Sequence, residues 1–445
     1  MIVKNFAILK YILPLFFGWW TSLLFITYLG LSFFPSTDPI HQKLFFPSPN
    51  LEYWIRWANW DGGHYRGIAE NGYLPIQTVF FPFYPILIKL LMFLGLSSLW
   101  SSLLISQAST LITLFFFYKL VLLDHSKVLA KRAVFVLLIF PTSFYLVASY
   151  SESLFLALTI TAFYFARTKK WAWAFLLAGL ATITRMVGIV TILAILFEIL
   201  IKDLPNFSLH YLWRTLLRRL FLYNLSLCLL LNLIISYLIT SSYWLLAGII
   251  LSLSNMLSIL LAGLALLSIL EWFLLHLNFK PLLFTKLIYP LLSFLPLLLY
   301  LLYQRVAFGN PLLFLNQEQA WNKSLSLPWH GPLIYWQSFQ ITGLQIGDSS
   351  RVLLELLLFS GLLVGLIISL YKLKPLYSFF YLLALLIPLL SGTLLDLPRY
   401  TLAIFPLFIL LGMIKEKLIQ KIGTIFSLLL SAALAILYIN SYWFM

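Results

Sequence analysis

The sequence predicts an all-α polytopic membrane protein. Its 445 residues have a mean hydropathy of +0.98, and 62% of them are hydrophobic while only 10% are charged. Apolar stretches longer than about 17 residues recur along the chain, and soluble domains do not carry them. Because a bilayer offers no water to backbone amides, such stretches must form helices or a closed barrel. Unbroken apolar runs, rather than alternating ones, indicate helices.

Basic clusters between the apolar stretches set the predicted topology. Short cytoplasmic loops are rich in Lys and Arg, so we place these clusters inside. The N-terminal MIVKNFAILK leads straight into an apolar stretch with no small-residue cleavage site, which predicts an uncleaved first span and a cytoplasmic N-terminus. The clusters are Lys4/Lys10, Lys127/Lys131/Arg132, Arg167/Lys169/Lys170, Lys202 to Arg219, Lys280/Lys286, Lys372/Lys374 and Lys415/Lys417/Lys421. About thirteen spans fit between them, at roughly 10–33, 99–123, 133–149, 152–167, 172–184, 187–201, 219–240, 243–276, 283–303, 351–371, 376–391, 399–414 and 421–441.

The apolar segment 80–96 does not fit this alternation. As a span it would place the following DHSKVLAKR loop outside and invert every later cluster. We therefore expect an interfacial or re-entrant helix on the outer membrane face. Pro82 and Pro85 then lie in its opening turn, where proline is tolerated. Two long outer loops result, at about 34–98 and about 304–350.

Composition and motifs exclude several classes of site. The single cysteine, Cys228, excludes an intramolecular disulfide and a thiolate metal cluster. The formal charge of +15 lies in short clusters between spans, not on one face, so we expect membrane lipids and no nucleic acid as partners. HExxH, GxGxxG, Walker and GxSxG motifs are absent, and the six His are scattered. We expect no metal site and no cofactor.

The first outer loop contains the charged stretch RWANWDGGHYRGIAENGY. Trp54, Trp57 and Trp60 recur every three residues, which predicts a stripe along one helix, and Gly62 with the following glycine is predicted to break that helix. Asp61 lies between them. A carboxylate held among aromatic rings at the lipid interface should have a raised affinity for protons and can act as a general base on a hydroxyl. The alternative is a helix N-cap or an ion pair with Arg66.

Further charged residues recur at the predicted outer ends of helices. Glu152 lies in SYSESLF, Arg185 in TRMVGI, and Asp396 and Arg399 in SGTLLDLPRY. Charges near the membrane are costly, so we expect these side chains to face a water-filled cavity or each other. Two converging arginines would suit a phosphate, which guanidinium binds in a bidentate manner. The alternative is a set of ordinary ion pairs, such as Glu152 with Arg185.

The second outer loop combines aromatic rings with amides and carboxylates. Sugar rings stack on aromatic faces and bond to such polar groups, although interfacial loops share this composition. The relevant residues are Arg305, Gln317, Glu318, Trp321, Trp329 and His330.

Six motifs, in this order and spacing, resemble the PIG-V family of mannosyltransferases, which belongs to the GT-C class of membrane glycosyltransferases. They are WDGGHYRGIAENGY, FFPFYP, FPTSFYLVASYSESLF, GLATITRMVGI, FGNPLLFLNQEQAW and LPRYTLAIFPLF. The resemblance spans residues 50–200 and 300–410, whereas residues 203–300 carry none of it. The chain resembles a prokaryotic relative of the family, which would use another acceptor.

The resemblance implies a GT-C fold and an enzyme that moves mannose from a polyprenyl-phosphate donor to a hydroxyl of a glycolipid or another acceptor. Transfer would invert the anomeric configuration without a metal, on the outer or lumenal face of a bacterial plasma membrane or of the endoplasmic reticulum. It also implies three parts: a core at 1–201 with the catalytic loop 34–98, variable transmembrane helices at 202–300, and a part at 301–445 with the second outer loop 304–350 and the last helices.

Asp61 matches the catalytic carboxylate of the class and is the expected general base. We expect Arg185 and Arg399 to contact the donor phosphate, and Glu152 to position a sugar or an arginine. The full set of expected substrate-binding residues is Trp60, His64, Tyr65, Arg66, Phe81, Tyr84, Glu152, Arg185, Gln317, Trp321, Arg399 and Tyr400. The alternatives are a transporter or flippase of lipid-linked sugar, and a GT-C enzyme with another acceptor, such as a protein O-mannosyltransferase.

Overall fold

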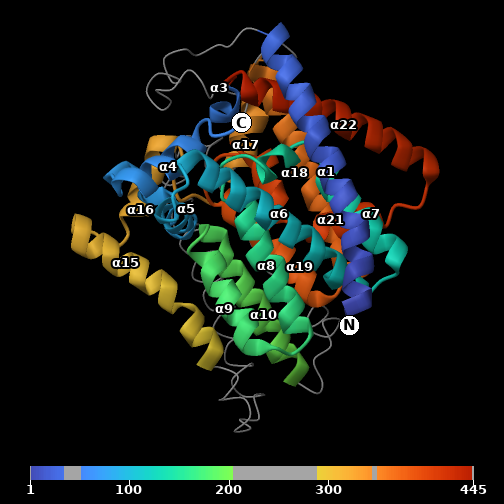
Figure 1. The fold of residues 1–445 in the computed structure, drawn as a ribbon, viewed down its shortest axis with the longest axis horizontal. Coiled ribbons are helices and arrows are strands. Elements are labelled where there is room, and N and C mark those ends of the chain that lie inside the picture. Colours follow the sequence, from blue (N-terminus) through green and yellow to red (C-terminus); the bar gives the residue numbers. More distant parts are fainter. Residues whose placement is uncertain (1, 35–51, 204–287, 343–347, 443–445) are drawn as a thin grey trace, which may run out of the picture. The chain divides into compact units, whose positions relative to one another are not determined.

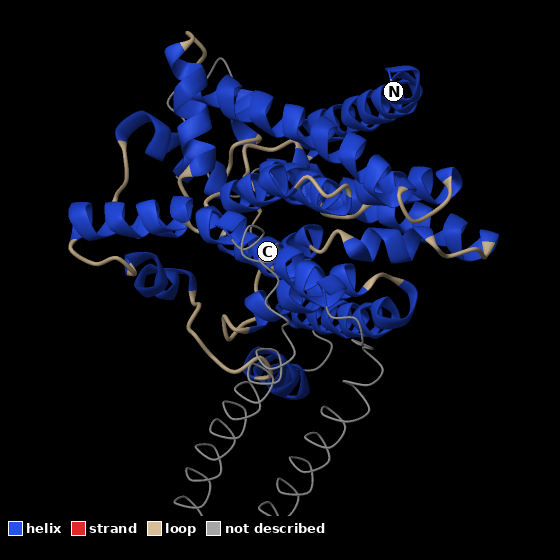
Figure 2. Ribbon diagram, turned by 90° about the horizontal axis from the view of Figure 1, so that it is seen from below, coloured by secondary structure: helices blue, strands red, loops and turns tan. Residues whose placement is uncertain are grey.

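The computed structural model describes residues 2–34, 52–203, 288–342 and 348–442, and every regular element in these ranges is helical (Figures 1 and 2). The all-α prediction is therefore confirmed for this part of the chain. The α-helices are α1 (Ile2–Phe33), α3 (Glu52–Arg56), α4 (Asp61–Asn71), α5 (Phe83–Phe93), α6 (Ser98–Leu122), α7 (Lys127–Ile139), α8 (Glu152–Arg167), α9 (Trp171–Thr182), α10 (Ile189–Asp203), α15 (Leu295–Phe308), α16 (Leu313–Gln317), α17 (His330–Thr342), α18 (Asp348–Lys372), α19 (Pro375–Leu389), α20 (Leu397–Tyr400), α21 (Pro406–Gly412) and α22 (Lys417–Ile439). The 3-10 helices are η2 (Pro75–Val79), η3 (Ser143–Leu146), η4 (Met186–Gly188), η6 (Glu318–Trp321) and η7 (Thr401–Ala403).

Five helices in the described ranges are long and apolar enough to cross a membrane. They lie at Asn5–Phe33, Ser98–Leu122, Ile288–Phe308, Arg351–Lys372 and Lys417–Ile439, each within or close to a predicted span. The chain is therefore a multi-pass membrane protein. The predicted spans at 219–240 and 243–276 lie outside the described residues.

Two predicted spans are divided into shorter helices. The span predicted at 133–149 ends as α7 at Ile139, and η3 follows Pro141. The span predicted at 399–414 consists of α20, η7 and α21, with Pro406 at the start of α21. Proline lacks the backbone N–H that continues a helix, and each of the two breaks lies close to a proline. The segment expected at the interface forms the 11-residue helix α5, which is too short to span a bilayer.

Helix α8 lies at the centre of the bundle, between α6 and α9 (Figure 1). Thirteen of its 16 residues are buried, because neighbouring helices pack against it on nearly every side. Glu152 is its first residue and is only 4% exposed. The centre of the fold therefore places a carboxylate where α8 begins, and the positive end of the helix dipole favours that charge.

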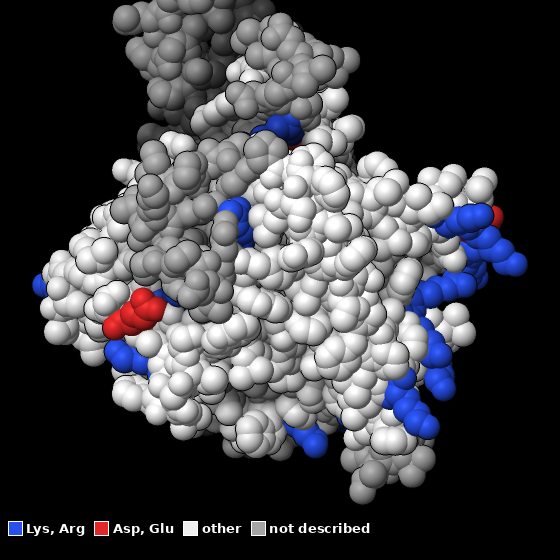
Figure 3. All heavy atoms as spheres, turned by 45° about the horizontal axis from the view of Figure 1, so that its top comes forward, with Lys and Arg blue, Asp and Glu red and all other residues white. Residues whose placement is uncertain are grey.

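The surface is poor in charge on the face shown in Figure 3, where Lys and Arg gather along one edge and most atoms belong to uncharged residues. Large apolar side chains are exposed on the long helices, among them Phe25 on α1, Leu363 on α18 and Phe426 on α22. Such a surface is stable against lipid rather than water. By its internal contacts the chain divides into residues 1–196 with 286–445, which hold the site described next, and residues 197–285.

Candidate functional site

A cavity of about 630 Å³ is lined by stretches that are far apart in the sequence. Its charged residues come from the start of α4, the segment around η4, the segment 315–325 and the start of α20. Eight of the predicted site residues line it: Trp60, Asp61, Tyr65, Phe81, Arg185, Trp321, Arg399 and Tyr400.

The chain turns sharply just before Asp61. Trp60 has φ 55° and ψ −117°, which is a rare conformation for a bulky residue, and Asp61 is the first residue of α4. Strained backbone of this kind concentrates at functional sites. The turn directs the Asp61 side chain, which is 21% exposed, into the cavity.

The predicted tryptophan stripe and glycine break are both wrong. Helix α3 ends at Arg56, so the three tryptophans do not share a helix, and Trp57 is buried in the core. Gly62 lies inside α4 rather than ending a helix. A Cβ atom there would come within 3.0 Å of the Ser149 carbonyl oxygen, so the glycine permits close packing of two backbones.

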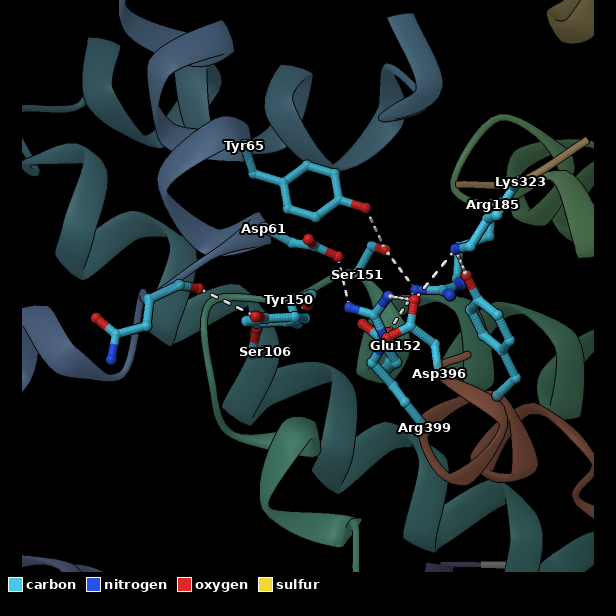
Figure 4. A network of polar contacts seen from close by, with 12 residues as sticks. Asp61, Tyr65, Ser106, Tyr150, Ser151, Glu152, Arg185, Lys323, Asp396 and Arg399 are labelled. Carbon is cyan, nitrogen blue, oxygen red and sulfur yellow. Dashed lines mark hydrogen bonds and ion pairs between the residues drawn. The ribbon is translucent and has the colours of Figure 1, made fainter. Parts of the chain in front are cut away.

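Arg399 is the centre of the charged network shown in Figure 4. Its Nη1 lies 2.5 Å from Asp61 Oδ2, its Nη2 lies 3.3 Å from Asp396 Oδ2, and its Nε lies 3.6 Å from Glu152 Oε1. The guanidinium also lies over the rings of Tyr145 and Tyr150, at 5.8 and 5.6 Å from their centroids. Carboxylates and aromatic faces together hold this cation in a fixed position.

Glu152 and Arg185 form the ion pair that we considered as an alternative. Arg185 Nη1 lies 2.6 Å from Glu152 Oε1 and donates to Ser151 Oγ at 3.3 Å. Ser151 Oγ is also 2.8 Å from the Tyr65 hydroxyl, which links α4 to the start of α8. Arg185 lines the cavity, whereas Glu152 lies behind it. The ion pair and the cavity wall are therefore one arrangement, and the two interpretations do not exclude each other.

Lys323 belongs to the site and was missed by sequence reasoning. Its Nζ lies 3.1 Å from Asp396 Oδ2 and donates to the Tyr400 hydroxyl at 2.7 Å, and the residue is only 8% exposed. A signal was available, because Lys323 and Arg305 are the two basic residues between positions 304 and 350. We predicted this segment to be an outer loop, and a lone lysine in such a loop does not contribute to the positive-inside distribution.

Asp396 occupies the space between two cations. It precedes α20 with φ 65°, in the left-handed region. Burial by itself would raise the pKa of Asp396, but the charges of Arg399 and Lys323 outweigh it, and the pKa lies below its ordinary value. Lys323 shows the opposite pattern: burial alone would lower its pKa, and the neighbouring Tyr400 and Asp396 raise it instead.

Glu318 is a further acidic residue on the cavity wall. Burial raises the pKa of Glu318, and the ammonium of Lys323 offsets only part of that effect. The acids Asp61, Glu318 and Asp396 and the bases Arg185, Lys323 and Arg399 thus share one cavity. Such a lining suits a polar ligand that carries negative charge and hydroxyl groups.

Besides Glu152, four predicted residues do not line the cavity directly. His64 stacks on Phe80 with ring centroids 4.8 Å apart, and burial lowers its pKa. Tyr84 is fully buried and donates to the Ser102 carbonyl oxygen at 2.9 Å. Arg66 Nε donates to Ser98 at 3.1 Å, and Gln317 ends α16. Within the described ranges, no group of three or more His, Cys, Asp or Glu side chains is arranged to hold a metal ion.

Part of the chain that forms this site matches a known protein family. A family model described as mannosyltransferase (PIG-V) matches residues 5–247, more than half of the chain. The match includes Asp61, Glu152 and Arg185, and it continues into residues 203–247, where we recognised no resemblance. No curated protein matches the sequence.

Proposed function

The chain belongs to the mannosyltransferase (PIG-V) family, and from this we propose that it transfers mannose from a polyprenyl-phosphate donor to an acceptor hydroxyl at the outer or lumenal membrane face. Mannosyl transfer is the activity of the family; the donor, the inverting mechanism and the role of Asp61 are our proposal.

The observation that supports it best is the convergence on one cavity of Asp61, Arg185 and Arg399. They come from α4, from the segment before η4 and from α20, and no local feature of the chain requires them to meet. A carboxylate opposite two guanidinium groups provides both requirements of glycosyl transfer from a lipid phosphate. The acid can accept a proton, and the guanidinium groups can stabilise the departing phosphate.

In the proposed step, the acceptor oxygen attacks C1 of the mannose from the face opposite the phosphate. Asp61 takes the hydroxyl proton as the new C1–O bond forms. The bond from C1 to the phosphate oxygen breaks, and the lipid phosphate leaves with the electron pair and one additional negative charge. Arg185 and Arg399 stabilise that charge, and the configuration at C1 is inverted.

The apolar part of the cavity wall favours a lipid donor. Ala384, Ile387 and Pro388 from the end of α19 line it, together with Val187 at η4 and Leu325. These side chains offer no hydrogen-bonding group to a sugar, but they provide favourable surroundings for isoprenoid units. The cavity thus has a charged region for the phosphate and an apolar region for the first part of the prenyl chain.

Replacement of the proposed base tests this function. Asp61→Asn keeps the size of the side chain but cannot accept the proton, so we expect kcat for transfer from polyprenyl-phosphate mannose to fall at least about 100-fold. Purified protein in detergent is assayed for released labelled product, and melting temperature and gel filtration confirm the fold. The matched control is Glu70→Gln, because Glu70 lies on the same helix but outside the cavity and is half-exposed.

Two outcomes would reject the proposal. Unimpaired turnover in Asp61→Asn would remove this carboxylate from the reaction. Movement of intact polyprenyl-phosphate mannose across vesicles, without release of polyprenyl phosphate, would instead indicate a carrier of lipid-linked sugar.

A further inference from the structure

Lys323 is a buried basic residue that the proposed chemistry does not use. An ammonium group is strongly hydrated, and lysine is rarely buried without a partner that compensates. Here the partners are Asp396 and the Tyr400 hydroxyl, and Lys323 also lines the cavity. The question is whether this lysine fastens its loop or acts on a ligand.

Other contacts hold the loop that contains Lys323 in place. We call residues 313–326 the strap, because both of its ends are bound to other parts of the fold. Near the first end, the Phe314 N–H donates to Gln304 Oε1 at 3.0 Å. At the other end, the Ser324 N–H donates to the Ser391 carbonyl oxygen at 3.0 Å. The strap therefore does not depend on the Lys323 side chain for its position.

Three cations converge on one aromatic ring. The Tyr400 ring centroid lies 5.5 Å from the Arg185 guanidinium carbon, 5.1 Å from Lys323 Nζ and 5.5 Å from the Arg399 guanidinium carbon. Like charges this close repel each other, and the carboxylate of Asp396 lies between two of them (Figure 4). A phosphate entering the cavity offers the same kind of oxygen ligand, with more acceptor positions.

We propose that Lys323 binds the phosphate of the lipid donor, as the third cation beside Arg185 and Arg399, and that Asp396 holds it in place until the donor enters. This inference rests on the proposed function. The ammonium donates a hydrogen bond to a phosphate oxygen and keeps its proton, so no bond to Lys323 forms or breaks. Because the phosphate gains a negative charge as it leaves, this contact strengthens in the transition state.

Binding of polyprenyl phosphate, the leaving group without its sugar, tests the assignment independently of turnover. We expect Lys323→Met in the full-length protein in detergent to weaken this binding about 10–100-fold, as the loss of one charged hydrogen bond predicts. Lys323→Arg keeps the charge and should bind within a few-fold of the original protein. The control is Lys374→Met, because Lys374 Nζ also pairs with a carboxylate, Asp124, at 2.7 Å but lies away from the cavity.

A double variant separates direct contact from simple neutralisation of Asp396. If Lys323 meets the phosphate, Lys323→Met combined with Asp396→Asn remains weak in binding. Restored binding in the double variant would show that the lysine only neutralises Asp396 and would overturn the proposal, as would unchanged affinity in folded Lys323→Met.

Inorganic phosphate, used alone as a competitor, identifies the source of the bound group. A site for the lipid donor requires far more inorganic phosphate than polyprenyl phosphate for the same occupancy. Equal potency of the two compounds would reject a lipid donor site. This binding measurement involves no turnover. If Asp61→Asn remained active, the proposed base would be rejected, but the test of Lys323 as a phosphate-binding residue would stand unchanged.

Discussion

At the scale of the residue, the position of Asp61 depends on the glycine that follows it. Ser149 faces Gly62 and is itself held, because its N–H donates to the Trp57 carbonyl oxygen at 2.8 Å. The two backbones therefore cannot separate easily to admit a side chain. The Asp61 carboxylate is positioned by close backbone packing, and only glycine allows that packing.

Substitution of this glycine should therefore reduce activity. Gly62→Ala adds a methyl group 3.0 Å from the Ser149 oxygen and displaces Asp61, so we expect kcat to fall about 10–100-fold with a lower melting temperature. The control is Gly67→Ala on the same helix, where the nearest atom would be 3.7 Å away. Alanine favours helix over glycine, so the control should keep its activity and its stability. Equal behaviour of the two variants would contradict this explanation.

At the scale of the element, a partly buried ion cluster joins three helix termini. Asp124 follows α6, and its carboxylate oxygens lie 2.5 Å from Nη1 of Arg167, the last residue of α8, and 2.7 Å from Nζ of Lys374, which precedes α19. Burial by itself would raise the pKa of Asp124, but hydrogen bonds from the two cations outweigh it and lower the pKa to about 2. These ion pairs hold the three helix ends at fixed positions, which apolar packing alone would not do.

Loss of this carboxylate should destabilise the bundle. Asp124→Asn removes the negative charge and one acceptor oxygen that face Arg167 and Lys374, at a cost of about 1–3 kcal/mol, so we expect a lower melting temperature at pH 7. A lowered pKa means that the contribution is present above the ordinary carboxyl pKa of about 4 and is lost as pH falls towards 2. The difference between variant and original protein should therefore shrink over that interval. Glu416→Gln, at an exposed carboxylate, is the control, and a constant difference down to pH 2 would argue against the ion cluster.

At the scale of the whole molecule, the proposed function requires the cavity to open on the outer or lumenal side. The basic residues of the loop after α8 predict, by the positive-inside rule, that this loop lies in the cytoplasm. Asn71 at the end of α4 and Lys169 after α8 are both exposed, and they should therefore lie on opposite sides of the membrane.

Thiol labelling of intact cells checks this orientation. In a Cys228→Ser background, a membrane-impermeant maleimide should modify Asn71→Cys in intact cells, and Lys169→Cys only after the membrane is opened. The reverse pattern would place the cavity in the cytoplasm and would be incompatible with the proposed reaction.

The class of the molecule and its family could be read from the sequence, because both depend on local properties. Hydropathy adds along each stretch, so the helical membrane class and the long helix α18 could be predicted without any tertiary contact. Motifs are likewise local, so Asp61 and Arg399 could be named as candidates before their meeting was known.

Which charged residues meet was decided only by the tertiary structure. Lys323 and Asp396 are 73 positions apart, and Asp61 and Arg399 are 338 apart, so no periodicity could reveal either pair. Arg66 had the same type of side chain as Arg399 and stood closer to Asp61 in the chain, yet it bonds to Ser98. Charge in an apolar bundle is stable only where packing brings a partner to it, and that partner is selected by three-dimensional proximity.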